Sequence, residues 1–223
     1  MHIVPIGGIL GARVEGLDLA GPVADKTFRA LEQSLGRHGV LCYPRQTLTS
    51  GELKAFAERF GTLEINVANV YQEPGLPDEL KSRLSGMTVT HDFAKFWDKM
   101  RLAPGSTRKP LTEAQRAAKP PVSHPVFLTH PITGRRVLYA NPGYAMRINE
   151  LPADESSRIL EFLFAHQLQQ KYQYKHHWQV GDVLMWDNIG TIHNAVPDYG
   201  PHEHRYIKRC QVMADRYFAA GTA

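Results

Sequence analysis

The sequence has few cysteines, no long apolar run and no block of basic residues. Its two cysteines, Cys42 and Cys210, lie far apart and lack the spacing of a zinc motif. We therefore expect two buried thiols, not linked to each other, in a reducing compartment. No apolar run approaches the roughly 20 residues needed to span a bilayer, and the N-terminus lacks the basic leader of a signal peptide. The expectation is a cytoplasmic protein that does not bind membranes.

The mild charge balance argues against nucleic acid as a partner. The chain of 223 residues has 26 basic and 22 acidic side chains, which gives a formal net charge of +4. The Lys/Arg-rich stretch 99–119 is better explained by a solvated surface loop than by a phosphate-binding patch. With 43% apolar and 22% charged residues, the composition is that of a folded domain. The sequence leaves the oligomeric state open, and a homo-oligomer is compatible with it.

Helix and strand patterns alternate in the first half of the chain, and strand patterns dominate the second. Apolar residues at helical spacing predict helices over 25–37, 49–61, 78–84, 93–100 and 154–169. Alternating or short apolar runs predict strands over 40–43, 65–70, 87–92, 172–178, 183–186, 191–196 and 206–213, and a hairpin over 126–140. The C-terminal half is therefore expected to be antiparallel β-structure with helices packed outside it.

Three side chains near the end of the sequence could carry chemistry. His193 follows a polar turn, and a neutral imidazole is a good ligand for Fe(II), Zn or Cu. Arg205 and Arg209 differ by four positions, so both would lie on one face of the predicted strand. Two guanidinium groups on a partly buried face are costly unless they meet anions. The alternatives are a core histidine and two surface arginines.

The stretch from Gly181 to Gln211, which contains these residues, resembles the C-terminal signature of the taurine/2,4-dichlorophenoxyacetate dioxygenase family. The segment 39–61, the Thr129–Arg135 hairpin and the helix from Asp154 also fall where that family has them. The resemblance implies one domain over residues 1–223, of the α+β, mainly β class, with a double-stranded β-helix (jelly roll, cupin-like) and flanking helices. It also implies a Fe(II)- and 2-oxoglutarate-dependent dioxygenase that oxidises a C–H bond with O2 and releases succinate and CO2.

The resemblance assigns a role to each of the three side chains. His193 matches the distal iron ligand, and Arg205 matches the arginine that grips the far carboxylate of 2-oxoglutarate. Arg209 matches a position that faces the anionic end of the substrate, which implies a small sulfonate, sulfate ester or carboxylate. Residues 186–188 are expected to shape the turn that orients His193.

Part of that family's metal site is missing from the sequence. The family supplies two further ligands as a His-x-Asp or His-x-Glu pair, because residues i and i+2 of a strand point to the same side. None of the eleven histidines has Asp or Glu two residues later. The family pattern breaks between Gly75 and Leu76, where several dozen residues are expected.

Three explanations of this gap remain open: a stretch of the protein missing from these 223 residues, an internal deletion, or a degenerate relative. Deleting core strands would cost more than the roughly 5–15 kcal/mol by which domains are stable, which favours the first. If the deletion is real, the alternative function is an inactive relative that acts as an anion-binding or interaction module. A different metalloenzyme built from His176, His177 and the pair His202-x-His204 has weaker support, because no cysteine or carboxylate cluster accompanies them.

Overall fold

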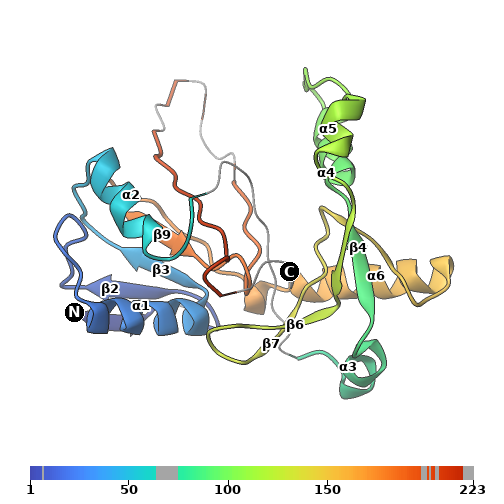
Figure 1. Cartoon of the computed structure of the whole chain (residues 1–223), viewed down its shortest axis with the longest axis horizontal. Helices are drawn as coiled ribbons and strands as arrows, with labels where there is room; N and C mark the ends of the chain where they lie inside the picture. The colour runs from blue at the N-terminus through green and yellow to red at the C-terminus, as the bar shows by residue number, and fades with distance from the viewer. Residues whose placement is uncertain (7, 64–74, 197–199, 201, 204–205, 218–223) are drawn as a thin grey trace. The chain divides into compact units, whose positions relative to one another are not determined.

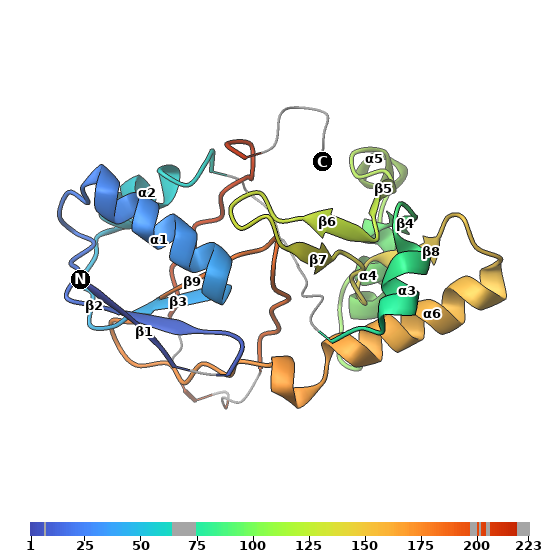
Figure 2. The same ribbon diagram turned by 90° about the horizontal axis from the view of Figure 1, so that it is seen from below.

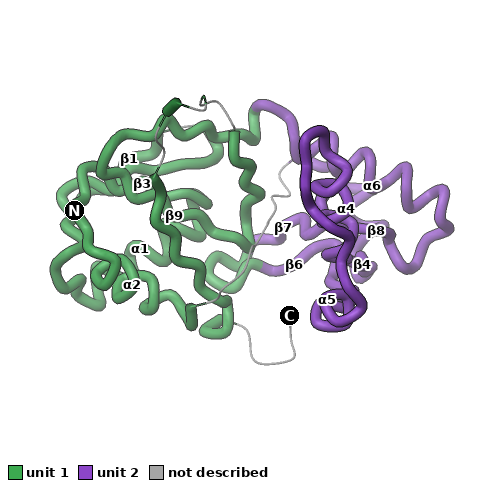
Figure 3. The backbone as a smooth tube through the Cα atoms, turned by 90° about the horizontal axis from the view of Figure 1, so that it is seen from above, with its two compact units in different colours: residues 1–70, 130–134, 171–223 green, residues 71–129, 135–170 purple. Residues whose placement is uncertain are grey.

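The computed structural model describes residues 1–6, 8–63, 75–196, 200, 202–203 and 206–217, which form two compact units (Figure 3). Unit 1 comprises residues 1–70, 130–134 and 171–223, and unit 2 comprises residues 71–129 and 135–170. Each unit combines stretches that lie far apart in the sequence, so the division does not cut the chain into two successive segments. The expectation of one domain over residues 1–223 stays a prediction.

Unit 1 contains a four-stranded sheet in the order β1 (His2–Pro5), β2 (Ala12–Glu15), β3 (Val40–Tyr43) and β9 (Val183–Trp186) (Figure 2). The pair β1–β2 is antiparallel, β2–β3 is parallel, and β3–β9 is antiparallel. The parallel step is made through helix α1 (Asp25–His38). The pairing of β3 with β9 brings together two segments from opposite ends of the sequence.

Two helices cover one face of this sheet (Figures 1 and 2). Helix α1 ends at Gly39, which takes the left-handed conformation with φ 67°. Helix α2 (Ser50–Glu58) begins at Thr49, whose hydroxyl accepts the backbone N–H of Glu52 while the Glu52 carboxylate accepts that of Thr49. Their apolar faces join the sheet in one core, made of Ala12, Val14, Leu19, Phe28, Leu31, Leu35, Leu41, Tyr43, Phe56 and Phe60.

Unit 2 contains a three-stranded sheet in the order β5 (Val122–Pro125), β4 (Thr88–His91) and β8 (Ala145–Ile148), with antiparallel pairing throughout. A separate antiparallel hairpin pairs β6 (Phe127–Thr129) with β7 (Arg136–Leu138). The helices of this unit are α3 (Asp78–Leu84), α4 (Phe93–Arg101), α5 (Glu113–Ala117) and α6 (Ala153–Gln167), followed by a short 3₁₀ turn, η1 (Gln170–Tyr172). Its core is formed by Leu76, Leu84, Val89, Val126, Leu138, Ala140, Ala145, Ile148, Leu160 and Leu163.

The five predicted helices, the strands at 40–43, 87–92 and 183–186, and the hairpin are confirmed within a few residues. The predicted strands over 172–178, 191–196 and 206–213 are wrong. These residues are all described, and the extended pairing found in them is one isolated bridge, Leu63 to Val212. A strand-like residue pattern does not hold a strand unless a neighbour pairs with its N–H and C=O groups. The predicted strand 65–70 lies outside the described residues.

Cys42 is buried, Cys210 is partly buried, and neither forms a disulfide. Among the described residues, every helix is too short or too polar to cross a membrane.

Candidate functional site

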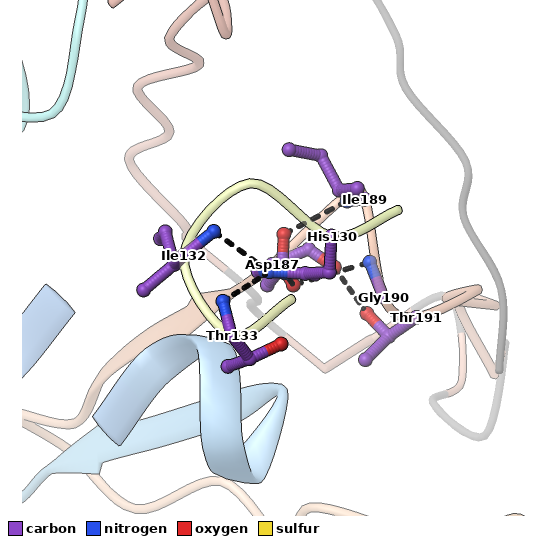
Figure 4. Close-up of polar contacts among 7 residues, drawn as sticks. All are labelled: His130, Ile132, Thr133, Asp187, Ile189, Gly190 and Thr191. Carbon is purple, nitrogen blue, oxygen red and sulfur yellow. Dashed lines mark hydrogen bonds and ion pairs between the residues drawn. The ribbon is translucent and has the colours of Figure 1, made fainter. Parts of the chain in front are cut away.

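The turn that follows β9 is built around Asp187 (Figure 4). The Asp187 carboxylate accepts hydrogen bonds from the backbone N–H groups of Ile189 (2.8 Å) and Gly190 (3.1 Å). The Thr191 hydroxyl donates to the Asp187 carbonyl oxygen at 2.8 Å. A Cβ atom at residue 190 would meet the Asp187 carboxylate at 2.8 Å, so this turn requires glycine there. The chain therefore leaves β9 in a fixed direction.

His130, from the loop 130–134 of unit 1, completes this network (Figure 4). Its Nδ1 accepts the backbone N–H groups of Ile132 (3.2 Å) and Thr133 (3.3 Å), so the ring proton lies on Nε2. Nε2 donates to the Asp187 carboxylate at 2.6 Å. Both side chains are buried and both have partners, which makes the pair a structural link between the loop and the turn.

His193 lies just beyond the same turn and has no such partners. Its ring packs on the indole of Trp186, with centroids 4.9 Å apart, and that indole N–H donates to the Asn188 side chain at 3.0 Å. The buried Nδ1 of His193 has no hydrogen-bond partner among the described residues. Burial and, after it, the positive charge of Arg209 lower the pKa of the imidazole from its usual value. The result is a neutral imidazole with an unpartnered nitrogen, the form that binds metals.

The two predicted anion-binding arginines differ in what the structure describes. Arg205 lies outside the described residues. Arg209 is exposed, in a segment that is not a strand, so its placement on the face of a partly buried strand is wrong. Its charge nevertheless acts on His193. An exposed guanidinium beside a partly buried imidazole can meet a small anion that arrives from solvent. The roles of both arginines stay predictions.

The described residues do not complete an iron site around His193. The site that the family resemblance implies combines two histidines and one carboxylate on one face of the metal. The described part of the chain holds one group of three metal-binding side chains whose ligand atoms all lie within 4.8 Å of one another, and that group is Cys42, His176 and Asp182. The unpartnered nitrogen of His193 fits a metal ligand, but the set of side chains around it does not fit iron.

Two arrangements in the structure are missing from the sequence predictions. The His130–Asp187 pair joins residues 57 positions apart, and the only signal was the polar turn at Asp187. The group Cys42, His176 and Asp182 depends on the pairing of β3 with β9. No spacing rule could have found it, because such rules apply to ligands that are close in sequence.

Comparison with known proteins identifies the family. Residues 65–211 match the model of the taurine catabolism dioxygenase TauD, TfdA family. The chain belongs to this family. Several of the similar proteins are named as alpha-ketoglutarate-dependent (2-oxoglutarate-dependent) dioxygenases.

Among similar proteins, the pentalenolactone F synthase of Streptomyces avermitilis is 24% identical over 94% of this chain and 92% of its own length. The alpha-ketoglutarate-dependent 2,4-dichlorophenoxyacetate dioxygenase of Cupriavidus pinatubonensis is 24% identical over 95% and 97%. A crystal structure from Burkholderia xenovorans, of a protein assigned as an alpha-ketoglutarate dependent 2,4-D dioxygenase, superposes with a TM-score of 0.84. It is 26% identical and covers 97% of this chain and 98% of its own. The predicted fold class, an α+β double-stranded β-helix with flanking helices, is confirmed by these similarities.

The alignments also show that the relatives contain residues that this chain lacks. Each of the two alignments to the named dioxygenase and synthase extends over 286 positions, which exceeds the 223 residues of the chain by 63. At least that many positions of each relative therefore have no counterpart here. That the gap falls between Gly75 and Leu76 stays a prediction. Partner strands among these positions would give a physical reason why the C-terminal strand patterns remain unpaired.

Proposed function

We propose that the protein oxidises a C–H bond of a small organic anion in a Fe(II)- and 2-oxoglutarate-dependent reaction. The observation that carries the proposal is the neutral imidazole of His193, whose Nδ1 has no hydrogen-bond partner in the described part of the chain and whose pKa the charge of Arg209 helps to lower, near the end of the matched TauD segment. The membership of the chain in the TauD, TfdA family supports the reaction type. Carboxylates are the first substrates to test, because one relative is named for 2,4-dichlorophenoxyacetate. Sulfonates and sulfate esters offer similar anionic groups.

Each side chain has a distinct part in this proposal. His193 holds the metal, Arg205 binds the far carboxylate of 2-oxoglutarate, and Arg209 binds the anionic end of the substrate. Iron, when bound, supplies the activation of O2. No His-x-Asp or His-x-Glu pair exists in these 223 residues, so the remaining iron ligands would come either from a stretch of the protein absent from them or from a different combination of side chains. The proposed location is the cytoplasm.

A second function is favoured by that missing pair. A relative without a complete metal site would still bind a carboxylate or sulfonate through its arginines and would act as an anion-binding or interaction module. The two functions differ in metal content, since one imidazole binds Fe(II) weakly compared with three protein ligands.

The test combines metal content with turnover. The purified chain is loaded anaerobically with Fe(II), and iron per chain and succinate formation are measured with 2-oxoglutarate and a panel of aryloxyacetates, sulfonates and sulfate esters. The oxygenase predicts about one iron per chain and succinate that depends on O2. His193→Ala should abolish both, whereas the same change at the exposed His177 should leave them unchanged.

Arg209→Ala separates substrate binding from the rest of the reaction. It should raise KM for the anionic substrate and leave substrate-independent 2-oxoglutarate turnover largely intact, with Lys208→Ala as the matched control. Loss of both activities together would assign Arg209 to the co-substrate or the fold. A parent protein that binds anions without iron or succinate formation would instead establish the binding module.

A further inference from the structure

The described residues contain one group of three side chains that could hold a metal ion, and it lies in unit 1. This group has no part in the function proposed for His193 and Arg209. Cys42 belongs to β3, and His176 and Asp182 belong to the segment that leads into β9. The Nε2 atom of His176 lies 3.0 Å from the Asp182 carboxylate, and the side chains of these two residues are 11% and 6% exposed. The three ligand atoms thus meet at an almost buried point that solvent reaches at its edge.

The backbone around Asp182 is fixed on both sides. The Asp182 carboxylate accepts the backbone N–H of Gln179 at 3.0 Å, and the carbonyl of Gly181 accepts that of Gln46 at 2.7 Å. Strand β9 begins at the next residue and pairs with β3, where Cys42 lies opposite Leu184. Asp182 is therefore held beside Cys42 by backbone contacts, not by the chance position of a long side chain.

The imidazole of His176 is held by neighbours that are not ligands. Its Nδ1 lies 3.0 Å from the hydroxyl of Tyr174, and its ring meets that of Trp178 edge-on at 4.8 Å. The Tyr174 ring lies directly on Gly11, which has φ +91° and where a Cβ would come within 2.9 Å of the ring. Metal-binding histidines are oriented by a hydrogen-bond acceptor at the remote ring nitrogen, and the Tyr174 hydroxyl oxygen can fill that position here.

A nucleophilic Cys–His–Asp site is excluded by the same contacts. Catalysis of that type needs one imidazole nitrogen for the thiol and the other for the carboxylate. Here Tyr174 and Asp182 occupy both nitrogens of His176. Burial, and then the charge of Asp182, raise the pKa of the Cys42 thiol to about 11, so the thiol stays protonated in the absence of a cation.

We propose that Cys42, His176 and Asp182 bind one Zn²⁺ through the thiolate, Nε2 and one carboxylate oxygen, with water as the fourth ligand. Sulfur, imidazole and carboxylate are the ligands that zinc takes in proteins, at about 2.3 Å from sulfur and about 2.0–2.2 Å from nitrogen and oxygen. Two atoms 3.0 Å apart, as Nε2 and the carboxylate oxygen are, can both lie at that distance from one ion. The thiolate and carboxylate charges together neutralise the cation.

Binding moves two protons. The Cys42 thiol releases its proton to solvent as its sulfur bonds to the metal. The single proton of His176 then lies on Nδ1 and is donated to the hydroxyl oxygen of Tyr174, which leaves the Nε2 lone pair for the ion. The site thus ties the segment before β9 to the centre of the sheet.

Cobalt(II) is the probe that tests this site, because a thiolate ligand gives it a charge-transfer absorption in the near ultraviolet. The reduced, metal-free full chain should bind one Co²⁺ with this band, and Zn²⁺ should displace it. Cys42→Ser should remove the band, and Asp182→Asn or His176→Gln should weaken the binding by more than about tenfold. Cys210→Ser and His177→Gln, the matched controls, should retain band and affinity.

The outcomes separate this site from the proposed iron site. His193→Ala should keep the thiolate band, since no cysteine is assigned to the metal at His193. Absence of the band from the folded parent chain, its loss in Cys210→Ser, or its persistence in Cys42→Ser would overturn the proposal. If circular dichroism shows that Cys42→Ser does not fold, the affinities of Asp182→Asn and His176→Gln decide: parental affinity in both overturns the proposal.

Discussion

His130 and His193 are linked to the same turn of unit 1, yet their surroundings are opposite. Every polar atom of the His130 ring has a partner, and its Nε2 donates to the buried carboxylate of Asp187. His130 is fully buried and His193 is partly buried, but the Nδ1 of His193 has no partner among the described residues. The first histidine stabilises the fold as it stands. The second lowers the stability of the unliganded protein, because an unpartnered buried polar group costs about 1–3 kcal/mol. A bound ligand would remove that cost.

The largest effect is expected from His130→Phe. The substitution leaves the buried Asp187 carboxylate without its ring donor, and Gly36 packs closely against the His130 ring, so a larger ring adds strain. Stability should fall by about 3–5 kcal/mol in urea unfolding. Removal of an exposed ion pair by Arg158→Ala should cost less than about 1 kcal/mol. Similar losses in both variants would contradict a structural role for the His130–Asp187 pair.

A third histidine, His91 of unit 2, should make the free energy of unfolding depend on pH. Burial and, after it, the charges of His124 and Lys95 oppose its protonation, despite a hydrogen bond to the Val89 carbonyl, and lower its pKa to about 4. An unfolded imidazole has a pKa of about 6.5, so between pH 6.5 and 4 the unfolded state takes up a proton that the folded state refuses. The stability that is present above pH 6.5 should therefore fall on acidification, by up to roughly 3 kcal/mol at pH 4.

Urea unfolding at several pH values tests this dependence. His91→Gln should flatten the decline between pH 6.5 and 4, and the same change at exposed His177 should leave it in place. A decline that persists unchanged in His91→Gln would show that other groups cause it.

The features that sequence predicted correctly are local. The helices predicted over 25–37 and 49–61 are bounded by residues within one turn, Gly39 after the first and the capping box of Thr49 and Glu52 at the start of the second, so a local pattern is sufficient to predict them. The hairpin of β6 and β7 is equally local. The family signature also assigned roles to His193 and Arg209 from one continuous stretch of sequence, and those roles stay predictions.

The features that sequence missed depend on distant segments. Residues 191–196 and 206–213 have the residue types of a strand, yet neither segment forms one. A strand needs a neighbouring strand to pair with, and the composition of a segment does not supply that neighbour. The proximity of Cys42 and Asp182 follows from the pairing of β3 with β9, and the hydrogen bond of His130 with Asp187 joins a hairpin loop to the turn after β9. Sequence spacing holds no information about either contact.

His193→Phe should change the free energy of unfolding much less than His130→Phe, and this difference tests the contrast between the two histidines. The aromatic contact with Trp186 is kept, while the buried nitrogen without a partner is removed. Replacing such a group by an apolar one of similar shape is close to neutral or stabilising, so the change in unfolding free energy should be within about 1 kcal/mol. A loss of several kcal/mol would mean that His193, like His130, already has a structural partner.

The smallest effect is a change in the titration of His193 itself. Arg209 is the named charge that lowers the pKa of this imidazole, after burial, so Arg209→Ala should raise that pKa towards its usual value. The shift can be followed by the proton resonance of the His193 ring in NMR titrations, with Lys208→Ala as the control that should not move it. Addition of an aryloxyacetate should raise the same pKa in the parent chain, because a substrate anion bound at Arg209 offsets the guanidinium charge, but not in Arg209→Ala. If neither the anion nor Arg209→Ala changes the pKa of His193, the charge of Arg209 does not act on this imidazole. The observation on which the proposed anion site rests would then be removed.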